Sequence, residues 1–138
     1  SRAVRGDMEK AMIDFNKAIS IKSDYAEVYY ARGRARYEMK DYQGALNDYT
    51  ETLKYKPNYK DALNNRGGIL MSAGKFDMAM SDFNAAIAID PSFGMAYYNR
   101  GVCYLNMKQS AKACADMEKA LSLGYRAARD ILQKYCNN

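Results

Sequence analysis

Arginine and aspartate recur along this sequence at one fixed interval, and together they could form an acid–base or anion-binding site. Within each residue type the positions lie 34 apart. The set comprises Asp14, Asp48, Asp82, Asp116, Arg32, Arg66 and Arg100. Chemistry is seldom repeated identically along a chain, so we interpret the set as structural. Each arginine is expected to pair with an aspartate on a packed helix, in its own unit or the one before, so that Arg66 would meet Asp48 or Asp82.

Histidine is absent from the chain, which removes Ser–His and Cys–His nucleophile pairs, the imidazole general base and the commonest metal ligand. The three cysteines, Cys103, Cys114 and Cys136, are too few and too widely spaced for the paired Cys-x-x-Cys blocks of a structural zinc site. We therefore predict that the protein is not an enzyme and has no catalytic, metal-binding or cofactor-binding residues.

The composition predicts a folded domain rather than a nucleic-acid or membrane protein. Hydrophobic residues make up 49% of the 138, and no apolar run reaches the roughly 18 residues that span a bilayer. The formal net charge is +5, but the basic residues are spread along the chain. We expect neither nucleic-acid binding nor membrane insertion. The opening, Ser1-Arg-Ala-Val-Arg5, has no initiator methionine or signal segment and looks like a piece of a longer protein.

The elements that must position these residues follow the same interval. Small residues also recur every 34 positions, and such a strict period indicates a stacked repeat protein. They are Gly33, Gly67, Gly101, Ala11, Ala45, Ala79 and Ala113. Small side chains on facing helices let the helix axes approach closely. Each complete unit shows two apolar patterns of helical period around a short polar break, and strand signals are absent, so the predicted class is all-α.

The period divides the chain into repeats. We predict one domain over residues 1–138, with a partial repeat at 1–25, full repeats at 26–59, 60–93 and 94–127, and the end of a capping helix at 128–138. Helices are expected near 7–21, 26–39, 43–55, 60–73, 76–89 and 126–136, and another pair is expected in the repeat at 94–127. Pro57 and Pro91 fall just after second helices, where they would stop helix continuation.

The repeat resembles the tetratricopeptide repeat, or TPR, over essentially the whole chain. The order of a bulky residue, Gly, Ala, an aromatic residue, Ala and Pro within 34 residues carries this resemblance. Segments 97–101 (YYNRG) and 79–86 (AMSDFNAA) are similar to bacterial members of the family. The resemblance implies a right-handed superhelical solenoid of antiparallel helix pairs, about 3.5 repeats long with a C-terminal capping helix. Thr52 stands where the family usually has Ala.

By that resemblance, the first helices of the repeats line a concave groove that binds a protein or peptide partner. The residues expected there are Tyr30, Arg34, Tyr37, Asn64, Asn65, Met71, Met95, Tyr98, Asn99 and Val102. One TPR subgroup clamps the C-terminal carboxylate of chaperone tails with Lys, Asn and Arg. Of the corresponding positions here, only Asn65 matches, so the sequence argues against a clamp for acidic tails.

Two questions stay open at the ends of the chain. The capping helix should pack against the apolar face of the last second helix, which would allow a Cys114–Cys136 disulfide if the protein is exported, and two buried thiols otherwise. The compartment is therefore unknown. The helix near 7–21 lacks a first helix to cover it, so self-assembly through its uncovered side, which includes Met8 and Ala11, is the alternative to groove binding.

Overall fold

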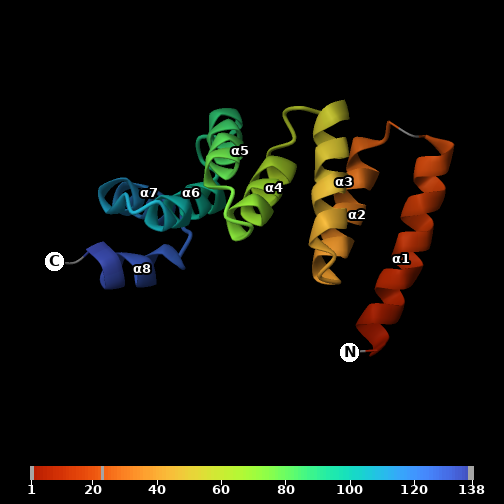
Figure 1. Ribbon diagram of the computed structural model, residues 1–138, viewed down its shortest axis with the longest axis horizontal. Helices are drawn as coiled ribbons and strands as arrows, with labels where there is room; N and C mark the ends of the chain where they lie inside the picture. The colour runs from red at the N-terminus through yellow and green to blue at the C-terminus, as the bar shows by residue number, and fades with distance from the viewer. Residues whose placement is uncertain (1, 23, 137–138) are drawn as a thin grey trace. The chain divides into compact units, whose positions relative to one another are not determined.

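The computed structural model describes residues 2–22 and 24–136. Within those ranges its helices are joined by short turns, and there are no strands. Figure 1 draws and labels the helices. They are α1 (Arg2–Ile21), α2 (Ala26–Glu38), α3 (Tyr42–Tyr55), α4 (Lys60–Ser72), α5 (Phe76–Ile89), α6 (Gly94–Asn106), α7 (Ser110–Ser122), α8 (Ala128–Ile131) and the π-helical turn η1 (Leu132–Cys136). None of the helices in these ranges is long and apolar enough to cross a bilayer. Residues 137–138 of the predicted cap lie outside the described residues.

Most predicted helix boundaries agree with the structure to within two residues, and α1 is the exception. The sequence predicts a helix over 7–21, whereas α1 begins at Arg2. In the complete repeats, the residues corresponding to 5–7 form the turn between the paired helices, at 39–41, 73–75 and 107–109. In α1 these positions are helical and do not form a turn.

A left-handed residue ends the first helix of every complete repeat. It is Gly74 in one repeat, and Lys40 and Lys108 in the other two, with φ of 65° and 60°. The residue that follows donates its N–H to a carbonyl five positions back, as Asp41 does to Arg36 at 2.8 Å. These bonds satisfy carbonyls at the helix end and set the antiparallel reversal.

The described chain divides into two compact units, residues 1–62 and 63–138. In unit 1, α1 packs against α2, and α2 pairs with α3. In unit 2, α5 packs against α6, α6 pairs with α7, and α8 and η1 lie on α7. The core of each repeat is a column of alanine and bulky residues with almost no exposure. It includes Ala45, Tyr49, Ala79, Phe83, Ala86, Ala113, Met117 and Ala120.

The recurring glycines lie against bulky side chains of the paired helix. A Cβ added at Gly67 would lie 2.6 Å from the Phe83 ring, and one at Gly33 would lie 2.8 Å from the Tyr49 ring. Both rings are fully buried and cannot swing aside. The glycines are therefore required by packing, which offsets the roughly 1 kcal/mol that glycine costs inside a helix.

Two neighbouring glycines of α4 should respond to alanine with opposite signs. Gly67→Ala is expected to lower the free energy of unfolding by about 1–2 kcal/mol, because the new methyl group collides with Phe83. Gly68→Ala is expected to raise it by up to about 1 kcal/mol, because a Cβ there meets nothing within 4 Å in the described chain. Urea denaturation measures both. Equal effects at the two sites would contradict the packing assignment.

Candidate functional site

The arginines and aspartates form paired interactions inside each complete repeat. Arg66 donates from Nε and Nη2 to the two carboxylate oxygens of Asp82, both at 2.8 Å. Arg100 binds Asp116 in the same forked way at 2.8 and 2.7 Å. The third fork joins Arg32 to Asp48 at 2.9 and 2.6 Å. The sequence left open whether each arginine pairs with the aspartate of its own repeat or of the one before. In the structure each arginine pairs with the aspartate of its own repeat.

Asp14 differs from the other aspartates of the set. It lies exposed on α1 and forms no ion pair with any residue that the structure describes. The arginine that would correspond to it would lie 16 positions earlier in sequence, as Arg32 does relative to Asp48. Within the described residues, no arginine is paired with Asp14 as one is with Asp48, Asp82 and Asp116.

The forks suit a structural role better than acid–base chemistry. The hydrogen bonds that Arg32, Arg66 and Arg100 donate to the aspartates raise the pKa of these arginines, although burial opposes the shift. A raised arginine pKa means that the ion pair is fully present at physiological pH and weakens only as pH rises through that higher value. The arginines also link successive repeats: Arg32 donates to Asn16 of α1 at 2.7 Å, and Arg100 donates to Asn84 of α5 at 3.0 Å.

In unit 1, the expected groove residues Tyr30, Arg34 and Tyr37 lie on α2. The Tyr30 ring contacts the Tyr59 ring at 4.8 Å between centroids and is half-buried. Tyr37 is 47% exposed and meets Tyr42 edge-on at 5.3 Å. Arg34 is exposed. Tyr30 is thus held in place, whereas Tyr37 and Arg34 are accessible.

In unit 2, the expected residues on α4 and α6 join the two first helices directly. The Asn99 side-chain amide donates to Asn64 Oδ1 at 2.9 Å. Asn64 is buried, while Asn65 and Met71 on α4 are half-buried. The bond fixes α4 and α6 side by side, so Asn64 acts as part of the framework of this surface.

The remaining expected residues of unit 2 lie on α6. Met95 is 42% exposed. Tyr98 packs on Tyr125 at 4.9 Å between ring centroids, and Tyr98 and Val102 both pack against the core cluster of Met117, Ala120 and Ala128. Sequence reasoning missed Tyr59 and Tyr125 as the supports of Tyr30 and Tyr98. The signal was an aromatic residue at nearly the same place in successive repeats, Tyr25, Tyr59, Phe93 and Tyr125.

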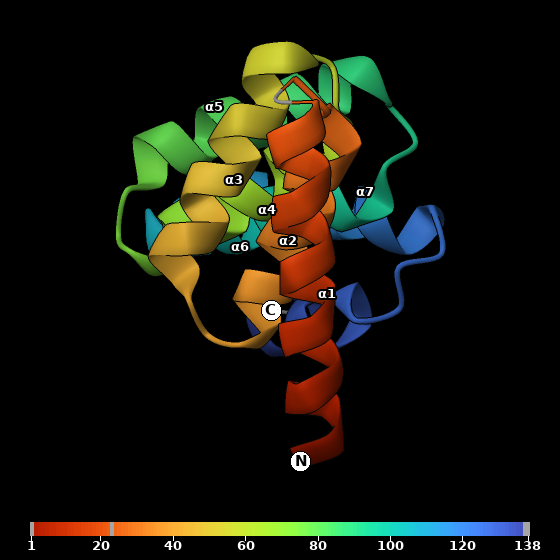
Figure 2. The same cartoon turned by 90° about the vertical axis from the view of Figure 1, so that its right-hand side faces the viewer.

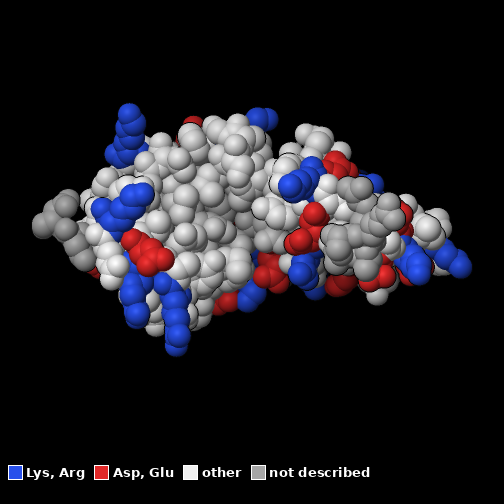
Figure 3. Space-filling view, turned by 90° about the horizontal axis from the view of Figure 1, so that it is seen from below, with Lys and Arg blue, Asp and Glu red and all other residues white. Residues whose placement is uncertain are grey.

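The surface of α6 is almost free of charge. Arg100 is its one charged residue, and its guanidinium is engaged by Asp116. In Figure 3, the face of unit 2 turned towards the viewer has a broad area without Lys, Arg, Asp or Glu side chains, and cations gather near the C-terminal end. Unit 2 therefore offers apolar and amide groups rather than a charged cleft.

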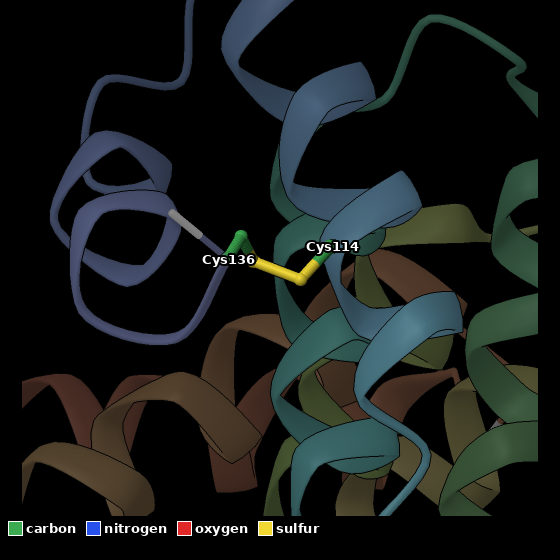
Figure 4. Close-up of a disulfide and its surroundings, with 2 residues drawn as sticks. All are labelled: Cys114 and Cys136. Carbon is green, nitrogen blue, oxygen red and sulfur yellow. A yellow bond between two sulfur atoms is a disulfide. The ribbon is translucent and has the colours of Figure 1, made fainter. Parts of the chain in front are cut away.

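The cysteines show no reactive site. Cys114 on α7 and Cys136 at the end of η1 are joined by a disulfide, with their Cα atoms 5.8 Å apart (Figure 4). Cys103 is buried, and its thiol donates to the Phe76 carbonyl at 3.7 Å. Burial, and to a lesser extent Asp77, raises the pKa of the Cys103 thiol, so it stays protonated at neutral pH and is a poor nucleophile. Among the described residues, no group of His, Cys, Asp and Glu side chains could hold a metal ion.

Comparison with known families and structures identifies the type of repeat. Tetratricopeptide-repeat families match residues 4–40, 30–93 and 83–115, which together extend over most of the chain. No curated protein sequence matches. Among solved structures, a crystal structure of MamA has 25% identity and a TM-score of 0.79, covering 88% of this chain and 71% of MamA.

Two solved TPR domains are also similar. The first TPR domain of RPAP3, solved with the HSP90 peptide SRMEEVD, has 28% identity and a TM-score of 0.75, covering 80% of this chain and 91% of that domain. The OM64 TPR domain of Arabidopsis has 29% identity and a TM-score of 0.73, covering 79% of this chain and 94% of that domain. The fold shared with these structures is an all-α solenoid of helix pairs.

Proposed function

Because the chain belongs to the tetratricopeptide repeat family of protein-interaction modules, we propose that its first helices bind a peptide or protein partner and that it catalyses no reaction of its own. The observation that best supports this proposal is the structure of the surface formed by α4 and α6 in unit 2. Its two helices are joined by the Asn99–Asn64 hydrogen bond, and Met95 lies exposed beside them. A rigid surface with an adaptable apolar side chain is typical of protein recognition.

The chemistry of this surface points to a partner with apolar side chains and accessible backbone. Met95 and the half-buried Met71 offer apolar contact, and Asn65 is an amide of the kind that can bond extended backbone. The peptide bound by RPAP3 is acidic and ends in a carboxylate. At the positions that bind such tails in the TPR subgroup described above, this chain has Tyr30, Met95 and other residues that do not reproduce the required set of cations. We therefore propose that its partner is less charged than those acidic tails.

Two exposed methionines provide a matched test. We expect Met95→Ala to weaken the binding of a peptide selected on the intact protein from a displayed library by about tenfold or more, because an apolar anchor is lost. Met78 is 55% exposed but lies on α5, a second helix, so Met78→Ala should change affinity by less than about twofold. Fluorescence anisotropy with the selected peptide measures both.

The same titrations can contradict the proposal. Equal affinity for wild-type protein and the Met95→Ala variant would exclude this part of the α6 surface as the binding site. The peptide SRMEEVD serves as the negative control, and tight binding of it would contradict the partner class. Binding to a surface with few charged groups should also change little between low and physiological salt, since few ion pairs form.

Self-association through α1 is the second candidate function. Ile13 and Ile21 on this helix are 67% and 78% exposed, and such exposure of large apolar side chains favours contact with another chain. Light scattering of this chain and of a longer one that adds preceding residues tests this. A monomer at all concentrations would exclude self-association, and a dimer lost on lengthening the chain would place the contact on α1.

A further inference from the structure

The C-terminal segment of unit 2 takes the place of a further first helix. The first helices α4 and α6 begin at Lys60 and Gly94, and α8 begins at Ala128, 34 residues further on. Together α8 and η1 extend to Cys136 and lie on α7, as a first helix would. We call residues 128–136 the cap. Because the first helices carry the proposed groove, the cap follows α6 as the next member of that row.

The cap is too short to hold its own conformation. Its two parts have four and five residues, whereas α6 has 13, and isolated helices shorter than about 12 residues are only marginally stable in water. Its apolar contacts come from Ala128, Ile131 and Leu132, near its beginning. The three residues that follow are exposed. The disulfide from Cys136 to Cys114 of α7 therefore holds the end of the cap that packing does not.

The same contacts support the groove residues of α6. Tyr98 and Val102 pack against the buried cluster of Met117, Ala120 and Ala128. Only Ala128 of this cluster belongs to the cap, and the other two residues belong to α7. Release of the cap would remove one buried member of the cluster and leave the two α6 side chains less constrained. A partner would then have to order them on binding, which lowers affinity.

The disulfide is open to chemical attack. Cys114 and Cys136 are both half-buried, whereas the free Cys103 has no exposure. Thiol–disulfide exchange requires a thiolate to reach one of the bridged sulfur atoms, and partial exposure allows this. The bonding state of one accessible bridge thus controls a segment on which the α6 surface depends.

We propose, resting on the groove function inferred above, that the Cys114–Cys136 bridge is a reversible redox lock on the groove of unit 2. The thiolate of a dithiol reductant attacks one sulfur atom and forms a mixed disulfide. The second thiol of the reductant then displaces the protein thiol, and the reductant leaves as a cyclic disulfide. The bridge takes up two electrons and two protons and becomes two thiols. The cap is released from α7, and the groove binds its partner more weakly.

Peptide binding in the two redox states tests the lock. The probe is a peptide without cysteine, selected from a displayed library on the intact oxidised chain, and dithiothreitol is the dithiol. Reduction should weaken binding in fluorescence anisotropy by about fivefold or more, because Tyr98 and Val102 must now be ordered by the partner. Cys136→Ser should have the reduced affinity with and without dithiothreitol. Re-oxidation of the wild-type protein should restore the original affinity.

Hydrogen exchange reports on the cap without any peptide. After reduction, the amides of residues 128–136 should exchange at least about tenfold faster, because local opening of the cap no longer requires the bridge to break. The amides of α2 and α3 in unit 1 should keep their rates. Circular dichroism should show that the other helices stay formed.

Two controls confine the effect to the bridge. Cys103→Ser should keep the full response to dithiothreitol, because Cys103 lies outside the bridge. All three cysteines lie in unit 2. The helix α1, which lies in front of α2 and α3 in Figure 2, has none. Self-association through α1 should therefore be the same in light scattering with and without reductant.

The failure of this inference differs from the failure of the groove itself. Equal affinity of Met95→Ala and wild-type protein for the peptide would overturn the groove and, with it, the lock. A Met95-dependent affinity that reduction leaves unchanged or raises would overturn the lock alone. So would a cap that stays protected from exchange after reduction, or an affinity that re-oxidation does not restore. Loss of helicity well beyond the cap on reduction would also overturn it, because the bridge would then hold the whole unit.

Discussion

Replacing Arg66 by alanine is expected to lower the free energy of unfolding by about 3 kcal/mol. The Asp82 side chain that it binds is only 7% exposed, so the substitution leaves a nearly buried carboxylate without its forked donor. The effect falls at the lower end of the range for buried pairs because 25% of the Arg66 side chain is exposed. Urea denaturation measures it, and Arg34→Ala, at an exposed arginine of α2, should change stability by less than about 0.5 kcal/mol.

A double-mutant cycle separates the Arg66–Asp82 interaction from other effects of the substitution. Arg66→Ala and Asp82→Asn should together cost less than the sum of the two single changes, with a coupling of about 1 kcal/mol or more. Asp48 binds Arg32 and Arg36, so it is expected to show the smaller coupling to Arg66. Coupling below about 0.5 kcal/mol with Asp82 would contradict a structural role for this pair.

Loss of the Cys114–Cys136 disulfide is expected to destabilise the oxidised protein by about 3 kcal/mol. The bridge closes a loop with a sequence separation of 22 and holds η1 on α7. Opening it frees the cap, whose Ala128 packs with Met117 and Ala120 of α7, so the C-terminal repeat should melt first. Cys136→Ser should show this loss in denaturation under oxidising conditions.

Reduction provides the matching control for the disulfide. Dithiothreitol should lower the stability of the wild-type protein to that of Cys136→Ser and should leave that variant unchanged. Cys103 is outside the bridge, so a Cys103→Ser variant should keep its sensitivity to reductant. Three titratable thiols in unfolded, oxidatively purified protein would contradict the bridge.

The sequence by itself determined the repeat and its helices. The interval of 34 residues predicts the helix pairs, the all-α class and the positions of the recurring glycines and alanines, because each depends on local patterns that recur within the chain. It also placed the arginines and aspartates on paired helices. The absence of histidine and of a metal-site cysteine spacing pointed to interaction rather than catalysis, because both are properties of composition and spacing alone.

Only the tertiary structure decided which groups meet. The interval allowed Arg66 to bind either of two aspartates, and helix packing places it on Asp82. Tyr98, which looked like an accessible groove residue, is braced by Tyr125 from the segment after α7. Asn64 is buried and accepts a hydrogen bond from Asn99. Each of these contacts joins residues that are distant in sequence, so the periodic pattern within a single helix cannot predict it.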